Sequence, residues 1–424
     1  PSHILTRKID YLDVAIKRFE VIRKSERTAV LMITPETGRL PEDMGGLAKY
    51  ISGKSGGQGE VVSALCEGLL ERGIDVHLVT LNLKKRFQRE SDLDEWGWRA
   101  VRYKIDSDKI PLVSSAVFAE NLSAYSGDPI ATAAEFQREI VNNVIKNVRA
   151  KHEGRLIVHS HDWMAGGAIT AYANATDLPV LHTVHNVFTA DLPLDLLAGV
   201  NLRGFENNLY YSESYGKKCI DCQATAIKNA SVINFVGERF LREVVDDYFL
   251  DQPLVPPSVR NEVKAKYYHG SAQAIINAPA SSMYPENCEH LVRKYGPDDP
   301  VLEAKRENLV EFQKRTGLTV DPYAILFFWP SRLDPFQKGV TLLEAVIGHF
   351  VNVYSHAQIA VVADGVGSDR THLDILGRIA WGSGARIPSH PFNEGLAVLG
   401  PAAPTPFSGA PFSGPAARTT QGGT

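Results

Sequence analysis

One stretch of this chain combines a cation with an unusually flexible backbone. GKSGGQGEVV (residues 53–62) places four glycines around Lys54, just before a sequence that is typical of a helix. Glycines let backbone amides approach a ligand closely, and a helix start adds unpaired N–H groups and a positive dipole end. With Gly56 and Gly57, Lys54 could therefore form an anion site, and phosphate fits best. The alternative is a flexible loop with a solvated lysine, and glycine content alone does not separate the two.

A second group of polar residues follows an apolar run. His159, His161, Asp162 and Trp163 (VHSHDW) come at the end of residues 156–158, and TVHN ends the next run in the same way, with His185 and Asn186. Ligands of open parallel sheets bind outside the carboxyl ends of the strands. Polar edges and an indole face suit a sugar. Metal binding is the rival interpretation, but the spacing matches no standard zinc pattern.

The elements that must position these groups alternate between strand and helix. Six apolar, β-branched runs predict strands in the first part of the chain: 28–34, 74–80, 155–161, 179–186, 231–237 and 272–278. Helical patterns lie between several of them, such as residues 60–73, where Gly73 is expected just beyond the last turn. Continuous apolar strands that alternate with helices predict a parallel sheet covered on both faces.

A similar pattern restarts after a charged helical segment. Residues 301–317 favour a helix, and 323–333, 357–365 and 385–390 favour strands of a second α/β unit. From Pro401 the chain becomes PAAPTPFSGAPFSGPAARTTQGGT, a low-complexity sequence without apolar periodicity. We therefore predict four parts, namely a Rossmann-like domain (27–280), a helical connection (281–320), a partial second Rossmann-like domain (321–400) and a tail (401–424).

Composition limits the classes of protein that this chain can belong to. Its 424 residues are enough for two domains, and 44% hydrophobic and 22% charged residues are typical of a soluble globular protein. A net charge of −4 does not favour binding to nucleic acid or membranes. No apolar run reaches the ~20 residues of a membrane span, and no secretory leader is visible, although the chain begins at Pro1. We expect a cytoplasmic protein.

Five motifs, taken in order, resemble those of the bacterial glycogen synthases and plant starch synthases. GKSGGQGEVV resembles the K-T-G-G-L-A-D-V loop of that family, HSHDW its H-A-H-D-W and TVHN its T-I-H-N. PSRLDPFQKG (330–339) resembles the S-R-L-x-x-Q-K-G segment that opens the second domain, and ADGVG (363–367) the Gly-rich turn that follows it. The resemblance runs from about Arg27 to about Gly400, with looser similarity between the motifs.

The resemblance implies the GT-B fold, in which two Rossmann-like domains face each other across a cleft. It also implies transfer of glucose from a nucleotide-sugar donor, ADP- or UDP-glucose, to the non-reducing end of an α-1,4-glucan. Anomeric configuration is retained, and neither a metal ion nor a separate cofactor is expected. The expected partners are thus the donor and the glucan, without nucleic acid or membrane, and the oligomeric state stays open.

The resemblance also implies roles for individual residues. His161 would hydrogen-bond the transferred glucose, with Asp162 and Asn186 as further contacts to the sugar or to the loop. Arg332 and Lys338 would stabilise the charge of the departing nucleoside diphosphate. Lys54, Gly56 and Gly57 would approach the same diphosphate from the first domain, and Gly365 belongs to the donor-binding set. Without the upstream motifs, Arg332 and Lys338 would instead be interpreted as members of a solvated loop.

The chain also departs from the family pattern. A later E-P-x-G-type segment, which carries an essential glutamate in the family, has no counterpart here, because Glu394 in HPFNEGLAVLG comes too early. We therefore expect a chain that is truncated in its donor-binding domain, and loss of activity is one alternative. The others are a sucrose- or trehalose-phosphate-forming transferase and a non-catalytic glucan-binding remnant. Cys219 and Cys222 form a C-x-x-C, expected to be two bystander thiols rather than a redox pair.

Overall fold

The structure is a computed structural model. It describes residues 27–53, 56–105, 109–248, 250, 254–278, 284–331, 333, 338–363, 369–381, 383, 386–387, 389–390, 396 and 399–400. None of the helices in these ranges combines the length and the apolar character needed to cross a bilayer.

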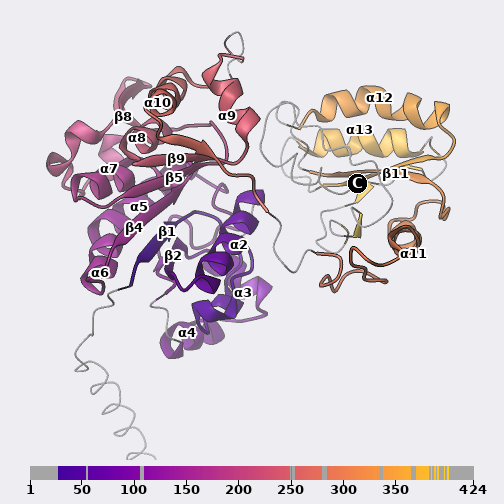
Figure 1. Cartoon of the computed structure of the whole chain (residues 1–424), viewed down its shortest axis with the longest axis horizontal. Coiled ribbons are helices and arrows are strands. Elements are labelled where there is room, and N and C mark those ends of the chain that lie inside the picture. The colour runs from indigo at the N-terminus through magenta and orange to yellow at the C-terminus, as the bar shows by residue number, and fades with distance from the viewer. Residues whose placement is uncertain are drawn as a thin grey trace, which may run out of the picture.

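A seven-stranded parallel sheet dominates the first part of the chain (Figure 1), in the order β10-β9-β5-β4-β1-β2-β3. Its strands are β1 Ala29–Ile33, β2 Asp75–Leu81, β3 Leu112–Val113, β4 Leu156–His161, β5 Val180–Val184, β9 Val232–Phe235 and β10 Ala272–Ala274. All six strands that the apolar runs predict are confirmed. β3 was not predicted, because two residues are too few to give an apolar run.

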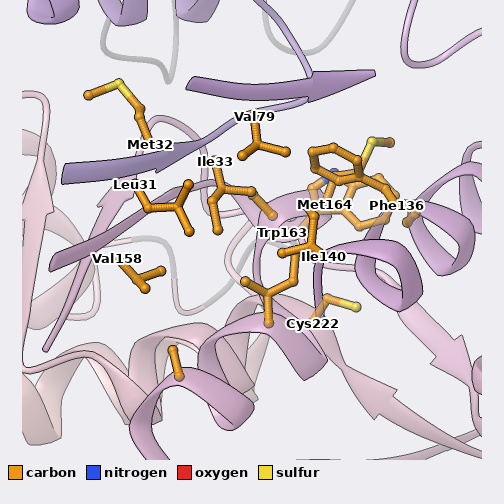
Figure 2. Close-up of a cluster of buried hydrophobic side chains, with 14 of the residues drawn as sticks. Leu31, Met32, Ile33, Val79, Phe136, Ile140, Val158, Trp163, Met164 and Cys222 are labelled. Carbon is orange, nitrogen blue, oxygen red and sulfur yellow. The ribbon is translucent and has the colours of Figure 1, made fainter. Parts of the chain in front are cut away.

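Helices cover both faces of this sheet because side chains of a strand alternate between its faces. Met32 of β1 points toward α2 (Gly57–Glu71), where the Cys66 thiol lies 3.7 Å from the Met32 sulfur. Leu31 and Ile33 point the other way (Figure 2). There they share a buried cluster with side chains from the neighbouring strands and helices, namely Val158, Val79, Phe136, Ile140, Trp163, Met164 and Cys222.

The other helices of this part follow the strands in sequence. They are α3 Lys84–Glu90, α4 Glu95–Lys104, α5 Pro129–Glu139, α6 Ile145–Ala150, α7 Gly167–Ala175, α8 Cys222–Asn229, α9 Glu238–Val245 and α10 Pro257–Tyr268. One π-helical turn, Ile140–Val144, joins α5 to α6. The predicted stop of α2 is confirmed, because Gly73 follows it with a φ of +74°.

A small antiparallel sheet, in the order β6-β8-β7, leads into α8. It consists of β6 Asp191–Pro193, β7 Tyr211–Ser214 and β8 Lys217–Asp221. Asp221 ends β8 and caps α8, since its Oδ1 accepts a hydrogen bond of 2.9 Å from the backbone N–H of Ala224. The sequence did not predict this sheet.

A three-stranded parallel sheet, β11-β12-β13, organises the residues from 284 onward. Its strands are β11 Ile325–Pro330, β12 Ala357–Val362 and β13 Ser389–His390, which confirms the three predicted strands, with β13 shorter than expected. The helix α11 (Val301–Thr316) covers one face, and α12 (Val340–Val353) and α13 (Asp369–Trp381) cover the other. Leu309 and Phe312 of α11 pack on Phe328, so the segment predicted as a connection contributes to this second core.

The approach of α7 to α8 depends on a glycine. A Cβ atom on Gly166 would lie 2.6 Å from the carbonyl oxygen of Cys222 and 2.8 Å from the Cβ of Ala226. Gly204 has no heavy atom within 4 Å of the same position. Neither glycine has a φ in the left-handed region, but the ψ of −133° at Gly166 lies outside the α and β regions, so both the lack of space and the backbone favour glycine there.

We therefore expect Gly166→Ala to destabilise the fold by about 1–3 kcal/mol, because α7 and α8 would have to move apart. Gly204→Ala should be neutral to within about 0.5 kcal/mol. Thermal unfolding of the two variants beside the wild type measures the difference. Equal midpoints for the two variants would contradict the close packing of α7 on α8.

Candidate functional site

The large sheet reverses its strand order between β1 and β4. The chain runs from β1 to β2 and β3 on one side, and then returns to place β4, β5, β9 and β10 on the other. Such a reversal opens a crevice at the carboxyl ends of the two strands, where open α/β sheets bind their ligands. The register pairs Ile33 with Ser160 and His161 with Thr183, so the ends of β1, β4 and β5 lie side by side.

Three histidine rings line this edge of the sheet. The ring of His161 stacks between His159 and His185, with ring centroids 4.3 Å and 5.2 Å away. His161 Nδ1 lies 2.9 Å from His185 Nε2, and His159 Nε2 lies 2.8 Å from the Thr183 hydroxyl. The orientation of His161 is therefore held by a hydrogen bond from the next strand.

Burial keeps these rings neutral. It lowers the pKa of His159 to about 3 and that of His185 to about 4, and it holds the pKa of His161 well below its usual value. At neutral pH none of the three carries a charge with which to attract an anion. A neutral imidazole can still donate one hydrogen bond and accept another, which suits a hydroxyl group.

The second ring nitrogen of His161, Nε2, has no hydrogen-bond partner in the described part of the chain. This nitrogen is free for a ligand, since Nδ1 already faces His185. The side chain is fully buried, so a ligand could reach it only if the surrounding chain moves. The predicted sugar-binding atom is thus oriented and unpaired, but enclosed.

Asp162 connects the ends of β4 and β5. Its Oδ1 accepts hydrogen bonds from the backbone N–H groups of His185 (2.7 Å) and Asn186 (3.1 Å). Its own backbone has a φ of +55°, in the left-handed region that non-glycine residues rarely adopt. Burial raises the pKa of its carboxyl to about 7, the two backbone N–H groups lower it and the charge of Glu36 raises it further. Asp162 therefore contacts the loop after β5.

Asn186 shapes the same loop. Its Oδ1 accepts a hydrogen bond of 2.9 Å from the N–H of Phe188, and its carbonyl accepts one of 3.1 Å from Gln223 Nε2. This turn leaves the Phe188 ring 56% exposed. Sequence reasoning did not single out Phe188, the exposed aromatic ring beside these residues.

The prediction that Trp163 offers an indole face to a sugar is wrong. Its side chain is 7% exposed and lies in the apolar cluster beneath the sheet, next to Met164 and Phe136 (Figure 2). The exposed ring of Phe188, whose centroid is 6.0 Å from that of Trp163, continues this cluster toward the surface. The backbone turn at Asp162 redirects the chain inward, which the motif alone does not reveal.

The predicted anion loop ends at α2, which begins at Gly57 after Gly56. Gly59 needs to be glycine, because a Cβ there would lie 3.1 Å from the backbone nitrogen of Gly38. This close approach brings the loop after β1 onto the first turn of α2, where the Gly38 N–H donates to the Gly59 carbonyl over 2.9 Å. The first turn of α2 and the end of β1 therefore form one surface.

Glu36 is a buried carboxylate in this surface that sequence reasoning missed. A Cβ on Gly56 would lie 3.8 Å from a carboxyl oxygen of Glu36, and the charge of Glu36 also acts on Asp162. Glu36 thus lies between the start of α2 and the end of β4. Glu36 comes shortly after the end of β1, and His161 is the last residue of β4. Ligands of open parallel sheets bind at the carboxyl ends of the strands, so this rule could have identified Glu36 from the sequence as it identified His161.

Three predicted residues, Lys54, Arg332 and Gly365, lie outside the described residues. Lys338 is described, and it immediately precedes Gly339 at the start of α12. It thus lies at the positive end of a helix dipole, a position that favours anions. Among the predicted residues of the first part, the structure brings together His161, Asp162, Asn186, Gly56 and Gly57.

The two cysteines of the C-x-x-C are buried and protonated. Cys219 and Cys222 are buried free thiols, and burial raises the pKa of both, that of Cys222 to about 12. A thiol that stays protonated at neutral pH is a poor nucleophile. Both features are those expected of two bystander thiols, which stays a prediction.

Sequence comparisons relate the chain to synthases of storage glucans. A model of the family described as the starch synthase catalytic domain matches residues 29–254, more than half of the chain. The glycogen synthase of Exiguobacterium sibiricum is 25% identical over 320 residues, which covers 69% of this chain and 63% of that protein. The glycogen synthase of Erwinia tasmaniensis is 30% identical over 204 residues, covering 45% and 39%. The chain thus spans less than two-thirds of the length of these relatives.

A comparison of folds agrees. The catalytic domain of starch synthase IV from Arabidopsis thaliana, solved with ADP and acarbose bound, superposes with a TM-score of 0.69 at 17% identity. The match covers 92% of this chain and 79% of that one. At this level of identity the similarity concerns the fold, and it confirms the predicted α/β architecture of the GT-B type.

The buried carboxyl of Asp162 should make stability depend on pH. Its folded pKa of about 7 lies above the value near 3.9 of an unfolded aspartate, so the unfolded chain loses this proton first. Wild-type stability should therefore fall between about pH 4 and pH 7, by at most roughly 1.4 kcal/mol per pH unit. Asp162→Asn keeps the acceptor oxygen and removes the titration, so its unfolding midpoint should rise relative to wild type across this window.

Asp298→Asn, at an exposed site, is the matched control and should follow the wild type at each pH. Thermal unfolding from pH 5 to pH 8 provides the measurement. A constant difference between wild type and Asp162→Asn over this range would contradict a buried, late-titrating carboxyl.

Proposed function

Since the chain belongs to the family of starch synthase catalytic domains, we propose that it is a glucosyltransferase. It would transfer glucose from ADP- or UDP-glucose to the non-reducing end of an α-1,4-glucan, with retention of configuration. Residues 27–280 would serve the glucan and the transferred sugar, and residues 321–400 would serve the nucleotide. As with a synthase of storage glucan, we assign the protein to the cytoplasm.

The neutral histidine at the strand-order reversal is the observation that carries this proposal. His161 is oriented by His185, is uncharged because of burial, and keeps Nε2 unpaired within the described residues. An uncharged donor and acceptor favours a sugar hydroxyl over a phosphate. We therefore assign His161 to the glucose unit, with Nε2 as the contacting atom.

Glu36 supports the same assignment. A carboxylate beside the start of α2 repels phosphate and accepts hydrogen bonds from hydroxyl groups. We propose that Glu36 binds a hydroxyl of glucose and that the diphosphate binds at the start of α2, near Gly57. The open space around Gly57, where a Cβ would meet no heavy atom within 4 Å, fits the approach of a bulky group.

Cations would stabilise the departing diphosphate. The bond between the anomeric carbon and the diphosphate oxygen breaks, and a new bond forms to the hydroxyl oxygen of the acceptor on the same face. The leaving phosphate accepts the proton of that hydroxyl. Negative charge grows on the diphosphate during this step, so fixed positive groups lower the barrier. We assign this role to Arg332 and Lys338, and to Lys54 from the first part of the chain.

The identity of the nucleotide in the donor rests on fewer observations than the role of His161. ADP is bound by the similar starch synthase IV, which favours ADP-glucose as the first donor to test. A sucrose- or trehalose-phosphate-forming activity would share the donor half of the site and differ in the acceptor. A glucan primer, fructose and a sugar phosphate, offered separately, distinguish these activities.

The first test is the removal of the His161 imidazole. His161→Ala should reduce glucosyl transfer from radiolabelled ADP-glucose to glycogen by ~10²-fold or more, because a donor aimed at the reacting sugar is lost. The effect should fall on kcat more than on the KM for the donor. His269→Ala, which removes an exposed histidine at the end of α10, should leave the rate unchanged.

The outcome of this assay decides between the alternatives. Transfer to fructose or a sugar phosphate, but not to glycogen, would contradict the glucan acceptor. Glucan binding in native gels without any release of nucleoside diphosphate would identify a non-catalytic glucan-binding protein. Equal rates for His161→Ala and wild type would overturn the role of His161.

A second test concerns the cations. Lys338→Ala, Arg332→Ala and Lys54→Ala should each reduce turnover by ~10²-fold, with a smaller loss for Lys338→Arg, which keeps the charge. Glu303→Gln on the exposed side of α11 serves as a control of charge away from the site. Wild-type turnover in any of the three alanine variants would remove that residue from the diphosphate site.

A further inference from the structure

A second cluster of side chains that could bind a ligand lies at the amino ends of the strands of the large sheet, opposite to the candidate active site. Asp75 and His77 occupy alternate positions at the start of β2, and His152 lies between α6 and β4. The three contribute donor atoms that all lie within 4.8 Å of one another. We propose that Asp75, His77 and His152 form a binding site for a divalent transition-metal ion, with zinc as the best match.

The distances between the donor atoms fit such an ion. His77 Nε2 lies 2.9 Å from His152 Nε2, and Asp75 Oδ2 lies 3.6 Å from the first and 3.9 Å from the second. A circle through three points with these separations has a radius of about 2.0 Å. An ion about 0.5 Å out of the plane of the three donor atoms would therefore have three bonds of about 2.1 Å, within the range of zinc bonds to imidazole nitrogen and carboxylate oxygen. The fourth position would belong to water.

Asp75 and His152 are also in the protonation states that a metal ion requires. The contact with His77 lowers the pKa of Asp75, and so does Lys109, so the carboxylate is ionised. Burial lowers the pKa of His152, which keeps this imidazole neutral. Neither of these two side chains has to lose a net proton on binding, because a neutral His152 ring that carries its proton on Nε2 only has to shift it to Nδ1.

The surroundings support the carboxylate and limit the affinity. Lys109 Nζ donates to Asp75 Oδ1 over 2.9 Å, which orients the carboxylate and leaves Oδ2 toward the histidines. Lys109 and Lys151 are positive and oppose a second cation nearby. His152 Nδ1 has no partner among the described residues, so no hydrogen bond to this second ring nitrogen would hold the orientation of the ligating ring. We therefore expect weaker binding than at a closed four-ligand zinc site.

The ion would have a structural role. β2 and β4 both pair with β1, with Ala29 opposite both Asp75 and Leu156. An ion held by β2 and by the segment before β4 would clamp these two strands across β1, at their amino ends. The candidate active site lies at the carboxyl ends, so this inference is independent of the proposed reaction, for which no metal ion is expected.

The alternative is a hydrogen bond between His77 and His152 without metal. To distinguish the two, the full chain is treated with a chelator, exchanged into chelator-free buffer and titrated with Co²⁺ and then Zn²⁺. The wild type should bind one Co²⁺ with the visible absorption of a four-coordinate ion, and Zn²⁺ should displace it. Zn²⁺ should also raise the unfolding temperature, since it binds the folded state.

His77→Ala and His152→Ala should each weaken binding by ~100-fold and abolish the rise in unfolding temperature, because one of three protein ligands is lost. His269→Ala should bind as the wild type does. His152→Gln and Asp75→Asn preserve size and serve if the alanine variants do not fold.

Two results would overturn the site. One is equal Zn²⁺ affinity in the wild type and in the folded cluster variants, which would place the ion elsewhere. The other is the lack of one-to-one binding by the wild type at 100-fold molar excess of Zn²⁺, which would leave the histidine pair as a simple hydrogen bond. Neither result bears on glucosyl transfer, which His77→Ala should leave unchanged once folded.

Discussion

The pairing of β4 with β1 on one side and with β5 on the other is the constraint on which the site depends. It brings together the ends of three strands that are far apart in the sequence, and it sets their register residue by residue. His161, Glu36 and the loop held by Asp162 meet only because β4 lies where the strand order reverses. A shift of β4 by one residue would exchange the two faces of the strand and turn His161 away from His185.

Burial determines the charge of the histidine side chains in this site. The rings of His159, His161 and His185 are stacked and enclosed, so none of them is charged near neutral pH. In the proposed reaction, the charge of the diphosphate would be met by Lys54, Arg332 and Lys338. This division explains how one protein could bind an uncharged sugar and a diphosphate in neighbouring places. The same enclosure means that a ligand reaches His161 only after a movement of the chain.

Local patterns predicted the framework of the fold well. Buried parallel strands are continuous apolar runs, and the stop of α2 at Gly73 follows from backbone geometry, so both can be recognised in the sequence. β7 and β8 could not, because the residues that pair where these strands meet, such as Glu213 with Lys218 and Ser214 with Lys217, are polar and give no apolar run. In the site, His161 and Asn186 were found from their positions after strands. The inward turn at Asp162, the burial of Trp163 and the place of Glu36 depend on contacts between distant segments, which no local pattern contains.

The outermost strands of the large sheet are its shortest. β3 has two residues and β10 has three, whereas the strands between them have four to seven. An outermost strand exposes unpaired N–H and carbonyl groups that can template a strand from another molecule. Because β3 and β10 expose few of these groups, a strand of another molecule could form few hydrogen bonds with either side of the sheet. The colloidal behaviour of the folded protein at high concentration should therefore depend on its surface charge, and not on growth of its sheet into fibrils.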